Sequence, residues 1–298
     1  MTQTEMTHAS AAGFDTRDSS AALLILAGAQ AEAARAVQGA VPEIAAAAEL
    51  AAACLRAGGR LIYAAAGSSG LMALADAAEL PGTFGLAQDR IVMLLAGGVD
   101  ALPALPGGPE DDADAARADV AAAEIGPGDC LIALTASGYT PYPMAAAAAA
   151  RAAGARSIGI SNNVGAALFA QVDIGICLPT PPEVIAGSTR MGAGTAQKIA
   201  LNMLSTMVAV HLGHVHDGYM VNLVADNAKL RGRAQRIVTS ITGVTAEQAM
   251  VCLDRANGGV KLAIVLAAGA ADVAGARQLL SAHSGHLRPV LAALGRPA

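Results

Sequence analysis

Short apolar runs alternate with helical stretches between residues 60 and 178, and this alternation limits the possible folds more than any other feature. The predicted strands are Arg60–Ala66, Arg90–Ala96, Cys130–Thr135, Arg156–Ser161 and Ile174–Leu178. The helical stretches between them lie near Leu71–Glu79, Asp112–Glu124, Met144–Ala153 and Gly165–Ala170. Apolar strands separated by helices are typical of a parallel sheet covered on both faces. The sequence therefore predicts a doubly wound, three-layer α/β fold that binds ligands at the carboxyl ends of its strands.

Three segments are expected along the chain. Residues 1–18 are polar and irregular and predict a tail, whereas residues 19–240 hold the sheet and N-terminal helices. Residues 241–298 predict a small module of three short helices, one of which begins at a capping-box pattern formed by Thr245 and Gln248. We expect this module to serve packing, without chemistry of its own.

Composition excludes several partner classes. The chain has 298 residues, of which 54% are hydrophobic but only 2% aromatic, so small side chains must pack its helices closely. A net charge of −5 without Lys/Arg runs argues against nucleic acid. The apolar runs Met144–Ala150 and Leu262–Ala271 fall short of the ~20 residues that span a bilayer. No membrane partner is expected.

The location expected from the sequence is the cytoplasm. The polar start, Met1 to Met6, does not resemble a secretory signal. The cysteines are scattered and form no C-x-x-C pair, which is typical of reduced thiols in a reducing compartment.

Two segments of similar pattern run from an apolar strand into a turn rich in Gly, Ser and Thr. Ser68 and Ser69 lie in the first turn, and Ser137 and Thr140 lie in the second. Backbone N–H groups, hydroxyls and a following helix N-terminus would converge at each turn, which suits an anion. A phosphorylated small molecule is the leading ligand class, because neither turn matches the G-x-S-x-G pattern of a serine nucleophile.

A third hydroxyl-rich segment begins at Gly187 and opens a long apolar helix toward Leu212. Ser188 or Thr189 is expected to be the N-cap of that helix.

Two glutamates could carry acid/base chemistry. Glu79 ends the helix after the first turn, and Glu110 lies in a Gly-rich loop after the second strand. Carboxylates in different environments can divide acid and base roles. Spacing alone favours a surface acid at a helix end for Glu79 and a helix N-terminal charge for Glu110.

Histidines form an H-x-x-H-x-H pattern at His211, His214 and His216. Zinc sites need further ligands at defined spacing, which this segment lacks. We interpret the pattern as a helix terminus, and no metal is expected.

From about residue 40 to about residue 290 the chain resembles the N-acetylmuramic acid 6-phosphate etherases, members of the sugar isomerase (SIS) superfamily. The stretches that carry the resemblance are Gly58–Tyr63, Asp76–Glu79, Pro141–Tyr142, Gly159–Asn163, Glu183–Arg190, Ala193–Lys198, Leu201–Thr206 and Asn227–Leu230. The resemblance implies a SIS-type fold with a C-terminal helical module and a homodimer.

The resemblance also implies an activity. It predicts a lyase that cleaves the D-lactyl ether of N-acetylmuramic acid 6-phosphate, giving N-acetylglucosamine 6-phosphate and D-lactate in cell-wall recycling. Glu79 matches the acid near the leaving group and Glu110 matches the base. Glu183, Ser188 and Thr189 join the four turn hydroxyls as substrate-binding residues. No cofactor is expected, since an aldehyde formed by ring opening stabilises the carbanion at C2.

Three single positions and one three-residue segment depart from the family pattern. Leu71, Tyr139 and Gly192 stand where the family usually has cations, and Leu80-Pro81-Gly82 replaces Cys-Pro-Pro. Each charge-assisted hydrogen bond is worth roughly 1.5–3 kcal/mol. A less anionic substrate and a non-catalytic sugar-phosphate regulator therefore stay as alternatives. An aldose–ketose isomerase is a third alternative, because its reaction also needs a base beside C2.

Overall fold

The computed structural model describes residues 2–225 and 227–296, which form two compact units. Unit 1 comprises Met1–Ala77 and Asp89–Ser205, and unit 2 comprises Ala78–Gln88 and Thr206–Ala298. Each unit is described by itself. The division falls earlier than the boundary expected near residue 240.

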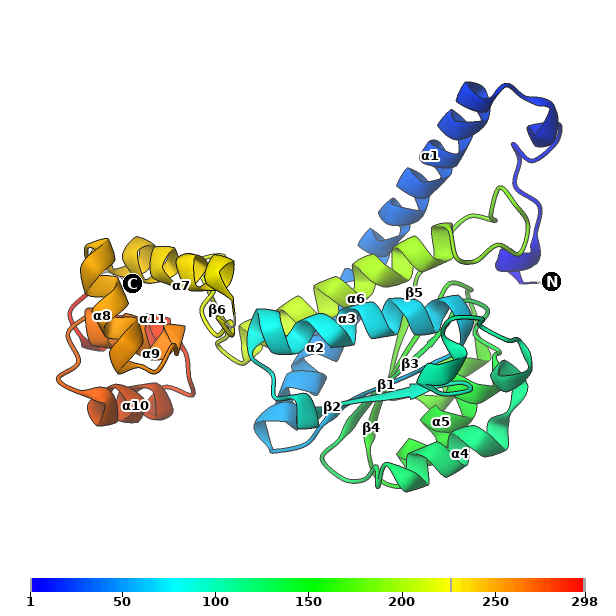
Figure 1. Ribbon diagram of the computed structural model, residues 1–298. Helices are drawn as coiled ribbons and strands as arrows, with labels where there is room; N and C mark the ends of the chain where they lie inside the picture. Colours follow the sequence, from blue (N-terminus) through cyan, green and yellow to red (C-terminus); the bar gives the residue numbers. More distant parts are fainter. Residues whose placement is uncertain (1, 226, 297–298) are drawn as a thin grey trace. The chain divides into compact units, whose positions relative to one another are not determined.

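Unit 1 is built on a five-stranded parallel sheet with the strand order β2-β1-β3-β4-β5 (Figure 1). The strands are β1 (Leu61–Ala65), β2 (Ile91–Leu95), β3 (Cys130–Thr135), β4 (Arg156–Ser161) and β5 (Ile174–Cys177). Every predicted strand is confirmed to within one residue at each end. Strands β1 and β3 are buried along their whole length, as expected for the centre of a covered sheet.

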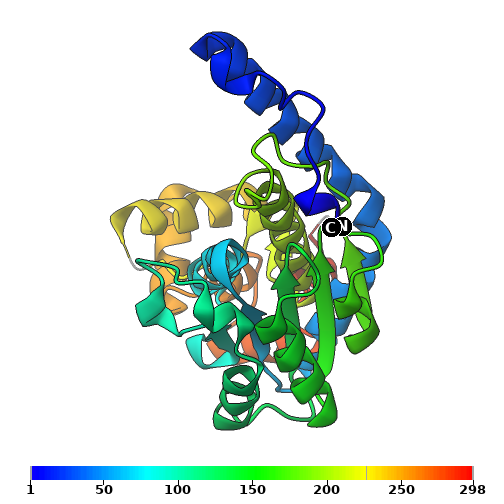
Figure 2. The ribbon, with the colours of Figure 1, turned by 90° about the vertical axis from the view of Figure 1, so that its right-hand side faces the viewer.

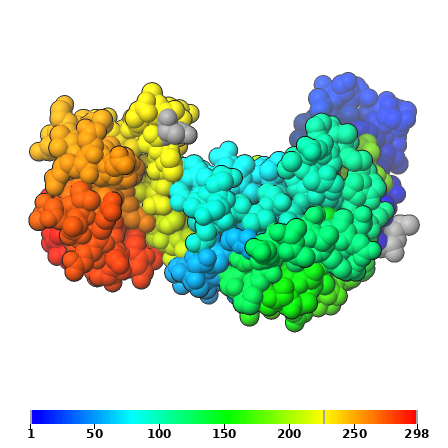
Figure 3. Space-filling view, turned by 60° about the horizontal axis from the view of Figure 1, so that its bottom comes forward, coloured from blue at the N-terminus to red at the C-terminus, as the bar shows by residue number. Residues whose placement is uncertain are grey.

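Helices cover both faces of the sheet, which confirms the three-layer prediction. They are α2 (Val41–Arg56), α3 (Gly67–Phe84), α4 (Ala113–Ala122), α5 (Pro141–Ala152) and α6 (Gly192–His211). Helices α4 and α5 form one layer, and α2 lies on the opposite face of the sheet (Figures 1 and 2). The α4–α5 layer contributes to the green part of the surface in Figure 3. The α4–α5 layer packs through small residues, with Ala116, Ala146 and Ala150 fully buried.

A buried polar network ties the helices on the second face to the sheet. The Tyr63 hydroxyl on β1 donates to an Asp76 oxygen on α3 over 2.8 Å. Asn202 and Ser205 on α6 donate to the other Asp76 oxygen, each over 2.9 Å. Burial raises the pKa of Asp76, although these three hydrogen bonds oppose the shift. The carboxyl group is thus fully used in holding α3 and α6 to β1.

Several predicted helices have different bounds in the structure. Helix α5 begins at Pro141, three residues before the predicted start, and α3 continues to Phe84, so Glu79 does not end it as predicted. Helix α3 begins at Gly67, four residues before the predicted start at Leu71, because the Gly70 amide already bonds to the Ala66 carbonyl. The stretch predicted as a helix over Gly165–Ala170 is a 3₁₀ turn at Ala167–Gln171.

The first residues of the chain are not a simple tail. They hold 3₁₀ turns at Gln3–Glu5 and Phe14–Thr16, and Thr4 is only 3% exposed. Helix α1 (Ser19–Ala36) follows and is joined to α2 by a 3₁₀ turn at Val37–Ala40. Figures 1 and 2 both show α1 extending from the rest of unit 1. Leu23 and Leu24 on this helix are exposed.

One helical stretch in the described residues, Ser19–Arg56, is long and apolar enough to cross a membrane by length and composition. It lies apart from the two shorter apolar runs, Met144–Ala150 and Leu262–Ala271. A single such stretch is weak evidence for a membrane span, since buried core helices can have the same length and apolar composition. Only 11% of its most apolar window is buried in the single chain, so its exposed apolar residues need another explanation.

Unit 2 has a helical core around α9 (Val260–Ala267). Besides the C-terminal ends of α3 and α6, it contains β6 (Val215–His216), β7 (Tyr219–Met220), α7 (Ala228–Thr242), α8 (Ala246–Arg255), α10 (Val273–Ala282) and α11 (Leu287–Ala293). The capping box at Thr245 and Gln248 is confirmed. The prediction of three short helices is wrong, because the described residues after 244 form four. Helix α7 shares their core through Ala234, Ile237 and Val238, which explains why unit 2 includes it.

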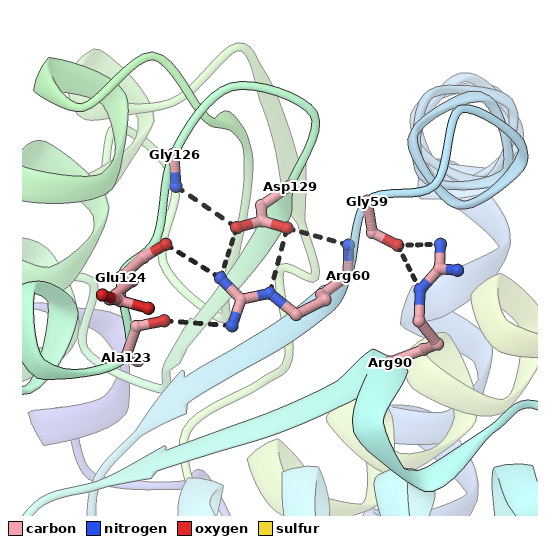
Figure 4. A network of polar contacts seen from close by, with 7 residues as sticks. All are labelled: Gly59, Arg60, Arg90, Ala123, Glu124, Gly126 and Asp129. Atoms are coloured by element: carbon pink, nitrogen blue, oxygen red, sulfur yellow. Dashed lines mark hydrogen bonds and ion pairs between the residues drawn. The ribbon is translucent and has the colours of Figure 1, made fainter.

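An ion pair between Arg60 and Asp129 fixes the amino ends of β1 and β3 (Figure 4). The Arg60 guanidinium donates to both Asp129 oxygens, over 3.2 and 2.7 Å, and the Arg60 amide also donates to this carboxylate over 2.9 Å. The guanidinium donates further to the Ala123 and Glu124 carbonyls, each over 3.0 Å. Burial acts to raise the pKa of Asp129, but the hydrogen bonds from Arg60 and Gly126 outweigh it and lower the pKa.

We predict that Arg60→Met lowers the free energy of unfolding by about 3 kcal/mol at neutral pH, because Asp129 is left buried without its partner. Urea unfolding measures the loss. The matched control, Arg117→Met, removes an ion pair between exposed side chains and should cost under about 0.5 kcal/mol.

This prediction has a pH dependence of known sign. The folded-state pKa of Asp129 is lowered, so its stabilisation is present above the unfolded pKa of about 3.9 and is lost as the pH falls through the folded value. The gap between the wild type and Arg60→Met should narrow from pH 7 to pH 3. An equal gap at both pH values would contradict the role of the pair.

Candidate active site

A pocket of about 210 Å³ opens in unit 1 where β1 and β3 end. Its polar lining consists of hydroxyl side chains and two carboxylates, namely Ser68, Ser69, Thr135, Ser137, Thr140, Thr189, Thr4, Glu5 and Glu110. Both predicted hydroxyl-rich turns therefore reach one cavity, as their place after parallel strands requires.

The first turn is the start of a helix. Because α3 begins at Gly67, Ser68 and Ser69 lie in its first turn, where backbone N–H groups have no helical acceptor. Gly67 has a φ of +51°, a left-handed conformation that lets the chain pass directly from β1 into the helix. The positive end of the α3 dipole faces the pocket together with the serine hydroxyls.

The second turn, between β3 and α5, holds three hydroxyl groups in a triangle. The Thr135 oxygen lies 2.7 Å from that of Thr140 and 3.2 Å from that of Ser137, and the last two are 3.3 Å apart. Gly138 has a φ of +81°, and a Cβ there would lie 2.2 Å from the Ala166 Cβ, so only glycine fits. The three hydroxyl groups hydrogen-bond to one another, and the oxygens of a bound anion could accept these hydrogen bonds instead.

Glu110 lies against the start of α3. It comes from a 3₁₀ turn at Gly108–Asp111, and a Cβ built on Gly67 would lie 2.4 Å from its Oε1 atom. Burial raises the pKa of Glu110, and the nearby Asp111 charge adds to the shift. The structure thus places a carboxyl group with a raised pKa beside the first hydroxyl-rich turn, which is suited to proton transfer.

The third hydroxyl-rich segment is used differently from the prediction. Helix α6 begins at Gly192, and its cap is the Glu183 carboxylate, which accepts from the Gly192 and Ala193 amides over 2.9 Å each. Neither Ser188 nor Thr189 caps the helix, so that prediction is wrong. Thr189 lines the pocket, whereas Glu183 and Ser188 do not, and their predicted substrate contacts stay predictions.

Glu79 is exposed on α3 and is not one of the residues that line the pocket. The single chain therefore brings Glu110 to the hydroxyl groups, but not Glu79. Whether Glu79 has a catalytic role stays a prediction.

Cations are missing from the pocket lining as far as the described residues go. At the three departures from the family pattern, the structure has a half-buried Leu71, an exposed Tyr139 and a Gly192 amide bound to Glu183. Any anion here would be held by hydroxyls, amides and a helix dipole. Residues 2–225 and 227–296 also hold no group of three His, Cys, Asp or Glu side chains placed to bind a metal ion.

Three polar residues of the pocket lining, Thr135, Thr4 and Glu5, were not predicted from the sequence. Thr135 could have been found as the last residue of a predicted strand that leads into the second turn. Thr4 and Glu5 carry no such signal, because only the folded chain brings the N-terminal segment to the pocket.

Comparisons of the sequence with known proteins identify the family of this chain. Residues 27–162 match the family model of the SIS domain. An N-acetylmuramic acid 6-phosphate etherase of Deinococcus radiodurans is 46% identical over 289 residues, which cover 97% of this chain and 95% of that protein. One of Thermobifida fusca is 50% identical over 231 residues, or 78% of this chain and 75% of that protein.

Among solved structures, a phosphoheptose isomerase from Francisella tularensis aligns with a TM-score of 0.47 and 22% identity, over 64% of this chain and 96% of that chain.

The parallel sheet, with a hydroxyl-lined pocket at its carboxyl edge, and the match over residues 27–162 define a SIS-domain protein. The curated relatives are more specific, since they align over most of both chains. The chain belongs to the N-acetylmuramic acid 6-phosphate etherase family, and the resemblance found in the sequence is confirmed.

We predict that Ser69→Ala and Ser137→Ala each weaken the binding of inorganic phosphate by about 3- to 10-fold, the value of one hydrogen bond. Calorimetric titration at low salt measures the affinity. Ser240→Ala, which removes an exposed hydroxyl in unit 2, is the control and should change nothing. Unchanged phosphate affinity in both pocket variants would contradict an anion site here.

Proposed function

We infer that the protein is an N-acetylmuramic acid 6-phosphate etherase, a lyase that releases D-lactate and N-acetylglucosamine 6-phosphate. The observation that carries this conclusion is the 46% identity to the Deinococcus radiodurans etherase over 95% of its length. The pocket supports it, because hydroxyls and a helix N-terminus suit a phosphate and Glu110 lies beside them.

The proposed mechanism begins with opening of the sugar ring, which places an aldehyde next to C2. Glu110 is the proposed base that removes the C2 proton, because its raised pKa brings it closer to the value of a useful base. The electron pair left at C2 then expels the lactate oxygen from C3, and an acid donates a proton to that oxygen. The elimination leaves a C2=C3 double bond. Water then adds across this bond, with its hydroxyl group at C3, and the Glu110 carboxyl returns the proton to C2. The phosphate would be held by Ser68, Ser69, Ser137 and Thr140.

Glu79 is the proposed acid, and its exposure in the single chain leads us to propose a homodimer. A second copy could bring its own Glu79 to the pocket. The exposed apolar residues of α1, Leu23 at 63% and Leu24 at 74%, support association, because burying them in a dimer is favourable. We also propose a cytoplasmic location and a role in cell-wall recycling, where this substrate arises.

The test of the function is direct release of D-lactate from N-acetylmuramic acid 6-phosphate. We expect turnover by the wild type and a loss of more than about 100-fold in Glu110→Gln and in Glu79→Gln, the usual contribution of a general acid or base. Both variants should still bind N-acetylglucosamine 6-phosphate. An absence of lactate release from the wild type would overturn the etherase assignment.

A third variant separates position from chemistry. Gly67→Ala retains Glu110, but the new methyl group would lie 2.4 Å from its Oε1 atom, so the carboxylate has to move. The φ of +51° at Gly67 adds backbone strain at the start of α3. We expect kcat to fall while the protein stays folded.

Mixing Glu79→Gln with Glu110→Gln should restore part of the activity if the two acids act across subunits, and no recovery would contradict a shared site.

The rate should depend on the ionisation of Glu110. A base must lose its proton, so kcat/KM should fall with decreasing pH through the raised pKa of Glu110. We predict that Asp111→Asn lowers this pKa and moves the acidic limb to lower pH, and that high salt reduces the difference because Asp111 is exposed. Asp114→Asn removes an exposed carboxylate nearby in sequence and is the control. A limb that does not move in Asp111→Asn would exclude Glu110 as its source.

A further inference from the structure

The N-terminal segment is held against the second hydroxyl-rich turn by one side chain, Asn163. Its carboxamide oxygen accepts from the Thr4 amide over 3.3 Å, and its Nδ2 donates to the Thr4 hydroxyl over 3.1 Å. The same Nδ2 lies 2.9 Å from the Ala136 carbonyl and 3.2 Å from the Ser137 carbonyl. Because Asn163 and Thr4 are both buried, this contact fixes the segment as part of the pocket wall.

Docking of Thr4 brings the next residue, Glu5, to the pocket. Glu5 lines the pocket together with Gly187, where a built Cβ would lie 3.7 Å from the Glu5 Oε2 atom. The pocket therefore holds two carboxylates from distant parts of the sequence, Glu5 and Glu110. Glu5 is exposed at the pocket, whereas Glu110 is half-buried.

The charge of Glu5 limits what it can contact. An ionised carboxylate only accepts hydrogen bonds, and it repels a phosphate dianion. The pocket lining within the described residues has no Lys or Arg that could lie between two such anions. The complementary group for Glu5 is therefore a neutral donor, such as a hydroxyl or an amide N–H.

We propose that Glu5 is a substrate-binding residue that accepts a hydrogen bond from a hydroxyl or N–H group of the sugar, away from the phosphate. This rests on the proposed function in one respect, that the ligand is a sugar phosphate. Glu5 thus selects for the sugar, while the hydroxyl-rich turns bind the phosphate that all such ligands share.

The experiment compares two probes in calorimetric titrations, N-acetylglucosamine 6-phosphate and inorganic phosphate. We expect Glu5→Ala to weaken the sugar phosphate about tenfold, the value of one hydrogen bond to a charged acceptor, and to leave inorganic phosphate unchanged or slightly tighter. Glu5→Gln keeps an acceptor oxygen and should lose less. Asp15→Asn, which removes an exposed carboxylate from the same N-terminal segment, is the control and should behave as the wild type.

Three results would overturn the proposal. Equal affinity of Glu5→Ala and the wild type for the sugar phosphate would mean that Glu5 lines the pocket without binding the sugar. Tighter binding of both probes would mean that Glu5 occupies the phosphate position itself. Loss of turnover in Glu5→Gln with unchanged sugar-phosphate affinity, and with one limb missing from the pH profile, would make it an acid or base instead.

The outcome is separable from that of the lactate assay. If the wild type releases no lactate but its affinity for N-acetylglucosamine 6-phosphate depends on Glu5, the etherase assignment fails and this proposal stands. If lactate is released and Glu5→Ala binds N-acetylglucosamine 6-phosphate as the wild type does, the etherase assignment stands and the proposal for Glu5 fails. Because Glu5 is exposed, its substitution should not unfold the protein, and circular dichroism checks this.

Discussion

Parallel pairing of β1 with β3 is the constraint on which the rest of the site depends. The register pairs Leu61 with Cys130 and Ala65 with Leu134, so the two strands end at the same edge of the sheet. The Arg60–Asp129 ion pair at their amino ends holds this register from the opposite edge, because the Arg60 amide and guanidinium both bind the same carboxylate (Figure 4). A slip of one residue would turn buried side chains toward the wrong helix layer. The two hydroxyl-rich turns can share one pocket only because this pairing is fixed.

The pocket uses neutral donors where a cation would be the more usual partner of a phosphate. The Thr135, Ser137 and Thr140 hydroxyls pair with one another in the single chain. An anion would have to replace these contacts, so each hydroxyl contributes only the difference between two hydrogen bonds. The N-terminus of α6 gives little help, since the Glu183 carboxylate already binds its first amides. The dipoles of α3 and of α5, which begins directly after Thr140, are therefore the main electrostatic attractions in the proposed phosphate site.

Two carboxylates line this pocket. Glu110 lies against Gly67, and Glu5 follows Thr4, which Asn163 holds at the pocket wall, so acidic side chains rather than cations would face the proposed ligand. Such an arrangement suits a sugar, whose hydroxyl and amide groups are donors, better than a second phosphate or a nucleotide. Catalysis at such a site would depend on proton transfer by carboxyl side chains.

The sequence by itself determined the strands, because buried parallel strands are short apolar runs that few other structures produce. It also determined the two hydroxyl-rich turns. Through the family resemblance, it identified Glu110 as a candidate base. Local pattern could not determine the start of α3, where Gly67 admits an earlier first turn, or the cap of α6, which comes from Glu183 nine residues before Gly192. Only the tertiary structure decided that Glu110 reaches the pocket, that Glu79 is exposed in the single chain, and that Thr4 and Glu5 form part of the wall. The physical reason is that these placements depend on contacts between residues far apart in sequence, such as Asn163 with Thr4, and no periodicity or propensity records such contacts.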